Sequence, residues 1–261
     1  MPTELDRALA FEERLRARCA ERIVPFRFGR AYFNDSHPRV WYLNELVVEA
    51  KDVDPGELAA EAELLHTDAG QAHRRCYVPD EAVGARLERF FGRIGWRVEQ
   101  EVVMAYRGGG DRSANTSSVE EVAREDVLPL REEISRGEPW GTDEDVVAEI
   151  MDANRLWEAA GSARYFTVRA EGAPVAAADL YSDGRIAQVE AVVTLPTHRS
   201  LGYASAVVLR AADEAQAAGH DLVFLGADAG DWPKELYARL GFEEIGRTWS
   251  FLRTPARVAL T

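Results

Sequence analysis

The chain has 261 residues, of which 46% are apolar and 29% charged, and its formal net charge is −14. These proportions are ordinary for one or two globular domains, whereas the acidic balance excludes the basic footprint that nucleic-acid binding needs. No apolar run approaches the roughly 20 residues of a membrane span, and the charged N-terminus lacks the apolar core of a secretory signal. We therefore expect a cytoplasmic protein that binds neither membrane nor nucleic acid.

The charge is uneven along the chain. Residues 1–110 carry a net charge of −3, and residues 111–261 a net charge of −11. An acidic half favours a cationic partner such as an amine, although solubility alone is an equally simple explanation. The two cysteines, Cys19 and Cys76, and the five histidines show no CxxC or HExxH spacing, so we expect no metal site.

The first half begins with a charged segment, residues 1–22, that is helical in pattern. A helix over 56–70, a short strand over 73–79 and a helix followed by a strand over 87–107 come next. The stretch RGGGDRSANTSS, residues 107–118, then predicts a flexible linker that buries nothing. We expect domains over 1–108 and 119–261, joined by a linker over 109–118.

The second half starts with helical spacing over 124–135 and 144–160, the latter with its N-cap near Thr142. Three strand candidates separated by turn sequences predict an antiparallel meander: ARYFTVRA (163–170), PVAAADLYS (174–182) and RIAQVEAVV (185–193). A loop and a helix that stops at Gly219 precede DLVFLGA (221–227), a strand type that is buried on both faces. The pattern closes with a helix over 232–241 and a strand over 242–253.

The two halves end alike. FFGRIGW lies over LYARLGF with an offset of 146 residues, which places Phe91 on Tyr237 and Gly95 on Gly241. A strand, a helix and a short strand precede both segments in the same order, which indicates an internal duplication. Where the second half has an R-x-x-G-x-A turn, the first has VVEAKDVDPGELA, whose Asp52 and Asp54 oppose an anion. We therefore expect a degenerate first half.

The stretch TLPTHRSLGYASAVVL (194–209) leads from a strand through a glycine-containing loop into a helix. A helix N-terminus exposes unpaired N–H groups and a partial positive charge, and small residues let a phosphate approach them. Arg199, Gly202 and Ala204 thus predict a phosphate cradle, against the simpler explanation of a packing turn. A dinucleotide-binding Rossmann fold is excluded because GxGxxG is absent and the preceding strands form a meander.

VEAVVTLPTHRSLGYASAVVL and LYARLGFEEIG together resemble the GNAT superfamily of acyl-CoA-dependent N-acetyltransferases, over most of residues 117–254. The resemblance implies an α/β (α+β) fold, a mixed and mostly antiparallel sheet flanked by helices, here duplicated as in tandem GNAT proteins. It implies acetyl-CoA as cosubstrate, a small amine or amino-acid-like acceptor and direct transfer, with a homodimer as one possible assembly. The cofactor-binding residues that it implies are Val192, Val193, Thr194, Arg199, Ser200, Leu201, Gly202, Tyr203 and Ala204.

Two residues are the candidates for catalysis. The resemblance makes Tyr237 the general acid, although Phe91 at the equivalent place also suggests a plain core aromatic. Glu190 is the candidate base, because a carboxylate in an apolar strand is costly unless it is paired or functional; a solvent-facing or salt-bridged residue is the alternative. Asp179 on the neighbouring strand is a weaker candidate by the same logic.

One feature departs from the family. Many members have an Asn about seven residues before the Tyr, where this chain has Gly230. Trp232 could stack on a ligand there, although we expect it to pack at the helix start. The departure leaves a second function open, that of a catalytically silent acyl-CoA-binding sensor or scaffold.

Overall fold

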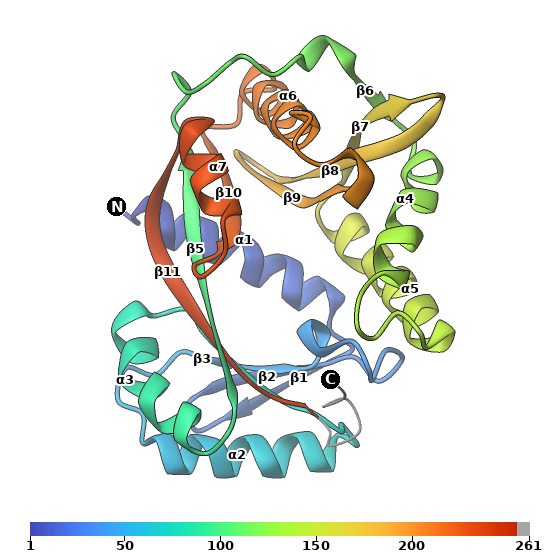
Figure 1. Ribbon diagram of the computed structural model, residues 1–261. Helices are drawn as coiled ribbons and strands as arrows, with labels where there is room; N and C mark the ends of the chain where they lie inside the picture. Colours follow the sequence, from blue (N-terminus) through green and yellow to red (C-terminus); the bar gives the residue numbers. More distant parts are fainter. Residues whose placement is uncertain (255–261) are drawn as a thin grey trace.

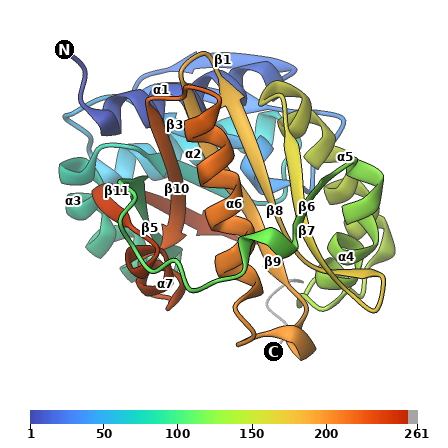
Figure 2. The same cartoon turned by 90° about the horizontal axis from the view of Figure 1, so that it is seen from above.

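The structure is a computed structural model, and it describes residues 1–254. In these residues eleven strands form one sheet in the order β1-β2-β3-β4-β11-β5-β10-β9-β8-β7-β6. Helices cover both faces, as Figures 1 and 2 show. The expected mixed α/β fold, mostly antiparallel and duplicated, is therefore confirmed.

The first half contains three helices and five strands, with a short 3-10 helix, η1 (Trp41–Leu43), before β3. The elements are α1 (Glu4–Cys19), β1 (Arg22–Phe26), β2 (Gly29–Phe33), β3 (Glu45–Val48), α2 (Pro55–Asp68), β4 (Arg74–Val78), α3 (Glu81–Arg93) and β5 (Arg97–Tyr106). The second half, as far as residue 254, contains four α-helices and six strands, with two short 3-10 helices, η2 (Thr116–Ser118) and η3 (Pro196–His198). The α-helices and strands are β6 (Val119–Val122), α4 (Arg124–Arg136), α5 (Glu144–Ala160), β7 (Arg164–Ala170), β8 (Ala173–Asp183), β9 (Ile186–Thr194), α6 (Tyr203–Ala217), β10 (Leu222–Asp228), α7 (Pro233–Arg239) and β11 (Phe242–Arg253).

The three strands β7, β8 and β9 pair antiparallel, which confirms the predicted meander. The strand β10 is buried from Leu222 to Leu225, as its continuous apolar run predicts. The helix α6 packs on one face of this part of the sheet through Val207, Leu209 and Ala211. On another face, α1 packs through Phe11 and Leu15, where Phe11 meets Phe224 edge to face.

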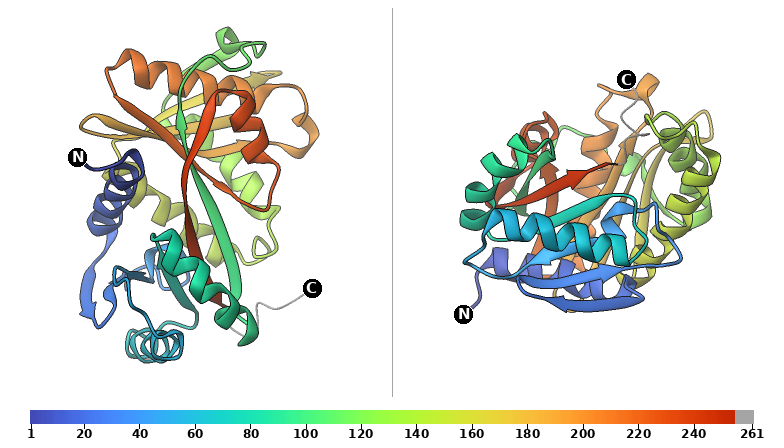
Figure 3. Two further views of the ribbon diagram at one scale, coloured as in Figure 1. Left: turned by 90° about the vertical axis from the view of Figure 1, so that its left-hand side faces the viewer. Right: turned by 90° about the horizontal axis from the view of Figure 1, so that it is seen from below.

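The last strand of each half crosses into the other half (Figure 1). β5 lies between β10 and β11, and β11 lies between β5 and β4, with Trp249–Leu252 pairing to both neighbours. Trp249 and Phe251 of β11 are consequently buried in the core of the first half, where Phe251 stacks on Phe91. The left panel of Figure 3 shows the two long strands crossing between the halves.

The duplication extends to local geometry. Gly95 and Gly241 both follow a helix end with left-handed φ values of 81° and 94°, which is why glycine occurs at both places. In each half one parallel strand pair precedes the crossing strand, β3 with β4 and β9 with β10. The helix α2 lies over the first-half sheet, as α6 lies over the second (Figures 1 and 3).

One local prediction is wrong. The 107–118 segment is not a chain that buries nothing: Asp111 N–H donates to the carbonyl of Arg239 at 2.7 Å, and Ala114 packs against the core. Gly110 lies against the backbone of Leu240 and Gly241 so closely that a Cβ would collide. The N-cap of α5, expected near Thr142, is the adjacent Asp143, whose carboxylate accepts from two N–H groups.

The predicted domain bounds stay a prediction, and residues 255–261 of the second domain lie outside the described residues. Within residues 1–254, no helix combines the length and the apolar character that crossing a membrane requires.

Candidate functional site

A cleft opens where β9 separates from β10. The parallel pairing covers only Ile186–Gln188 and Leu222–Phe224, although β9 continues to Thr194. Just beyond this point a β-bulge places Ala191 and Val192 opposite the single residue Ala178, and Ala191 takes a φ of 50°. Val193 and Thr194 still pair with β8, but on the β10 side Val192, Val193 and Thr194 have no partner strand and line a cavity of about 790 Å³.

The N-terminus of α6 lies at the same cavity. Ser200 and Gly202 precede it with left-handed φ values of 63° and 80°, and no side chain caps the helix. The first intrahelical bond runs from Ala206 N–H to Gly202, so the preceding N–H groups have no intrahelical partner. By contrast, Asp54 caps α2 in the first half and accepts from Glu57 N–H. Only the second half offers an open anion site at this helix.

Most of the candidate cofactor residues line this cavity. They are Val192, Val193, Thr194, Arg199, Ser200, Gly202, Tyr203 and Ala204. Leu201 is the exception: its side chain is exposed and does not line the cavity. Arg239 also lines the cavity, a cation that the sequence patterns did not reveal because it faces the cleft only through the orientation of α7.

Trp232 is 58% exposed and lines the same cavity, so the expectation that it packs at the helix start is wrong. Its ring is therefore accessible to a molecule in this cavity.

Tyr237 reaches the cleft from α7. It is 8% exposed, and its hydroxyl forms no hydrogen bond with any described residue. Burial raises the pKa of Tyr237 to about 12, with a further contribution from the charge of Glu190. The phenol therefore holds its proton at neutral pH and is placed to donate it.

Glu190 lies just before the bulge, on the other side of it from the cleft residues. Burial raises the pKa of Glu190, while the Ala191 N–H and Arg131 oppose the rise. Gln188 Nε2 donates to its carboxylate at 3.0 Å, and no described cation forms an ion pair with it. The salt-bridged alternative is thus wrong for the described residues.

Asp179 is fully buried and forms an ion pair with Arg131 of α4. Burial raises the pKa of Asp179 to about 7, and Arg131 opposes the rise. Its carboxylate lines neither cavity, so the structure separates it from the reacting region and makes it the partner that holds Arg131.

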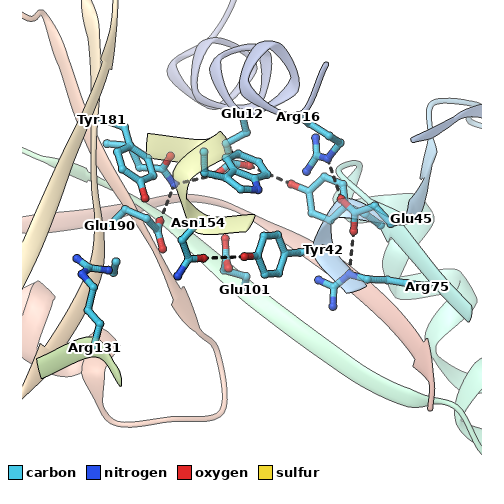
Figure 4. A pocket seen from close by; sticks show the side chains of 14 residues that line it. Glu12, Arg16, Tyr42, Glu45, Arg75, Glu101, Arg131, Asn154, Tyr181 and Glu190 are labelled. Carbon is cyan, nitrogen blue, oxygen red and sulfur yellow. Dashed lines mark hydrogen bonds and ion pairs between the residues drawn. The ribbon is translucent and has the colours of Figure 1, made fainter. Parts of the chain in front are cut away.

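A second cavity, of about 330 Å³, begins at Glu190 and Ala191 and extends between the two halves (Figure 4). Half of its lining comes from the first half of the chain: Glu12, Arg16, Tyr42, Glu45, Arg75, Tyr77 and Glu101. The remainder comes from the second half: Arg131, Asn154, Trp157, Tyr181, Gln188, Glu190 and Ala191. The two cavities therefore lie on either side of one bulge.

Sequence patterns did not point to the first-half residues of this cavity. Glu12 and Arg16 belong to the polar face of an amphipathic helix, and Glu101 to a strand with other charges nearby. Charges in such patterns are ordinarily solvated, and only the strand crossing and the position of α1 turn them inward.

Residues 127–242 match the family model of the Acetyltransferase (GNAT) family. A functionally unknown conserved protein from Staphylococcus epidermidis has a similar structure, with a TM-score of 0.68 and 14% identity over 90% of this chain and 94% of that one. A GCN5-related N-acetyltransferase from Kribbella flavida gives 0.63 and 19%, over 96% and 95%. A tandem GNAT protein from the clavulanic acid biosynthesis pathway gives 0.51 and 17%, over 79% and 74%.

At these identities the solved structures are alike in fold alone, and no match was found among curated proteins. The second half of the chain thus carries the match to the GNAT acetyltransferase family, and the chain as a whole has the tandem GNAT acetyltransferase fold.

Proposed function

We propose that the protein is an acetyl-CoA-dependent N-acetyltransferase that acetylates a small amine by direct transfer. The observation that carries the proposal is the placement of two cavities on either side of the β9 bulge, with Tyr237 in one and Glu190 in the other. A thioester bound in the larger cavity and an amine in the smaller would meet at the bulge.

The residues of the larger cavity fit a coenzyme A molecule. The uncapped N–H groups at the start of α6 suit a pyrophosphate, and Arg199 and Arg239 add positive charge without being held in an ion pair by any described residue. The edge of Val192–Thr194 on the side away from β8 has no partner strand and suits the amides of the pantetheine arm. Acetyl-CoA supplies the activated acetyl group.

In the proposed reaction the amine nitrogen bonds to the thioester carbon and the carbon–sulfur bond breaks. Glu190 removes the proton that the nitrogen loses, directly or through a water molecule, and Tyr237 gives its proton to the departing sulfur. A backbone N–H after the bulge polarises the carbonyl oxygen. Protons and electrons balance once Tyr237 regains a proton from solvent and Glu190 releases the one that it accepted.

The first half of the chain, in this proposal, has lost its own cofactor site and builds the acceptor pocket instead. Asp54 occupies the helix N-terminus that would otherwise bind a phosphate. Meanwhile α1, η1 and the strands β3, β4 and β5 contribute half of the smaller cavity.

Calorimetric titration with acetyl-CoA tests the cofactor site. We expect one site per chain in the micromolar range, weakened at least tenfold by Arg199→Glu with Gly202→Glu. Two sites per chain would contradict the degenerate first half, and no binding to the wild type would overturn the proposal.

Replacing Tyr237 by Phe separates the enzyme from the alternative, a silent acyl-CoA-binding protein. We expect acetyl transfer to fall roughly 10²-fold or more, as for a lost general acid, while acetyl-CoA binding is retained. Tyr106→Phe is the matched control, because its hydroxyl interacts with Arg112 and Asp213 away from both cavities. Absence of turnover in the wild type with every amine, despite binding, would favour the sensor.

A further inference from the structure

Three carboxylates that line the smaller cavity have no cationic partner. Glu12, Glu101 and Glu190 form no ion pair with any described residue, although most other charged groups of the interior are paired. Glu101 has no side-chain hydrogen bond at all within residues 1–254. Glu12 and Glu190 are half-buried and Glu101 is exposed to the open cavity, so a cation that enters the cavity can reach all three carboxylates.

Repulsion between the carboxylates adds to the rise in pKa that desolvation causes at Glu12 and Glu101. Burial raises the pKa of Glu12 to about 7, and the charge of Glu190 adds to the rise. The atoms around the cavity partly desolvate Glu101 and raise its pKa to about 8, with contributions from Glu12 and Glu190, although its side chain keeps contact with solvent. A bound cation would relieve this repulsion.

The arginines of the cavity are already neutralised. Glu45, itself buried, accepts from Arg16 Nε at 2.7 Å and from Arg75 Nε at 2.8 Å. Glu13 and Glu99 form further ion pairs with the same two arginines, at 3.3 and 3.5 Å. Arg131 is held by Asp179. Figure 4 shows the Arg16–Glu45–Arg75 group at one end of the cavity and Glu190 at the other, with Glu12 and Glu101 between them. The charge left without compensation is therefore negative, and it lies in the middle of the cavity.

The side chains around the smaller cavity leave it open for a ligand. Gly226 of β10 makes room for the Glu101 side chain, since a Cβ there would collide with its carboxylate. The aromatic rings of Tyr42, Tyr77 and Trp157 line the same space and can face a cation.

Gln188 shows where a cation would be stabilised. Its Nε2 donates to Glu12 at 3.2 Å and to Glu190 at 3.0 Å, so one nitrogen already bridges two of the carboxylates. An ammonium group beside it would meet the same oxygens with a full positive charge.

We propose that the acceptor carries a second cationic group, as a short diamine does, and that Glu12 and Glu101 bind this distal ammonium while the reacting amine lies at Glu190. The placement of the reacting amine at Glu190 rests on the proposed function. The placement of the distal ammonium at Glu12 and Glu101 does not, because that group can bind without any acetyl transfer. The volume of about 330 Å³ lies at the small end of ligand pockets, which suits a molecule of this size.

Three acceptors of matched length test the proposal: putrescine, n-butylamine and γ-aminobutyrate end in an ammonium, a methyl group and a carboxylate. We expect kcat/KM with acetyl-CoA to be at least tenfold higher for putrescine than for n-butylamine, and lowest for γ-aminobutyrate. Equal values for putrescine and n-butylamine, or a preference for γ-aminobutyrate, would overturn the proposal.

Two single variants, Glu12→Gln and Glu101→Gln, should each reduce the ratio of putrescine to n-butylamine turnover at least fivefold. Glu125→Gln, an exposed carboxylate on α4, is the matched control and should leave the ratio unchanged. An unchanged ratio in both cavity variants would contradict the assignment even if putrescine were preferred.

Calorimetry with putrescine in the absence of acetyl-CoA distinguishes the two proposals. Binding that is weakened by Glu12→Gln and Glu101→Gln supports the ammonium site even if no acetyl transfer occurs, in which case only the proposed function fails. Failure of putrescine to bind with or without CoA would overturn the ammonium site while leaving the cofactor site standing.

Discussion

Glu190 illustrates how much one residue depends on its surroundings. In a strand that is otherwise apolar, a carboxylate is explained equally well by solvent, by an ion pair or by chemistry. The structure places it half-buried at the bulge, beside Gln188, without an ion pair among residues 1–254. Because burial raises the pKa of Glu190, the carboxyl changes charge closer to neutrality than an ordinary glutamate.

This shift has a consequence for the pH dependence of the reaction. A base must be ionised, so kcat/KM should rise with pH through the raised pKa of Glu190 rather than near the usual 4.5. Since burial raises the pKa of Tyr237 to about 12, no loss of the acid is expected at mildly alkaline pH. Steady-state rates across pH measure this, and Glu190→Gln should remove the rise. If kcat/KM still rose with pH in the same way in the variant, the rise would reflect titration of the acceptor amine and would contradict the assignment of Glu190 as the base.

At the scale of elements, the start of α6 differs from the start of α2 in a way that decides which half can bind an anion. The glycine of α6 is required by its φ of 80°, whereas a Cβ there would meet nothing within 4 Å. Gly202 is thus demanded first by backbone conformation, and the open space above it is left for a ligand.

Gly70 offers a matched control for this loop, because it has a φ of 72° and equally open surroundings at the end of α2. Replacing either glycine by Ala should cost about 1 kcal/mol of unfolding free energy, the cost of a left-handed alanine. Only Gly202→Ala should also weaken acetyl-CoA binding, by a few-fold. Urea denaturation and calorimetry measure the two effects, and equal cofactor affinity in both variants would mean that the loop does not contact the cofactor.

For the molecule as a whole, the exchange of β5 and β11 makes the halves interdependent. β10 and β11 both pair with β5 and not with each other, so residues 109–261 alone would lack a central strand. The core of the first half would in turn lose Trp249 and Phe251. A sheet interrupted in this way exposes unpaired backbone and apolar surface, which neither half can compensate alone.

The full chain should therefore unfold in a single cooperative transition. Urea curves followed by far-UV circular dichroism and by tryptophan fluorescence are expected to coincide. Phe251→Ala, which removes a fully buried ring, should shift both curves together by about 3–5 kcal/mol. Two separate transitions, or a soluble and folded 109–261 fragment, would show that the halves are independent.

Much of the fold could be predicted from local patterns. The meander, the buried strand β10 and the glycine-ended helices follow from alternation, continuous apolar runs and left-handed caps, each of which acts within a few residues. The prediction of a linker that buries nothing is wrong because glycines ordinarily indicate a flexible chain. At Gly110 the missing side chain instead permits close contact with the turn before β11. The prediction that Trp232 packs at the start of α7 is wrong because a tryptophan at a helix start usually packs against the core, whereas this one borders a cavity.

The sequence by itself determined most of the lining of the larger cavity, the proposed cofactor half of the site, because the strand, the loop and the start of α6 are continuous in the chain. It also determined that the fold is duplicated, since both copies keep their terminal helix–glycine–strand segment. Only the tertiary structure decided the acceptor half. Glu12, Glu101 and Glu190 come from a helix and two strands that are distant in sequence, and their charges look solvated until the strand exchange brings them to one cavity. Local patterns report which face of an element is polar, but not what lies opposite that face.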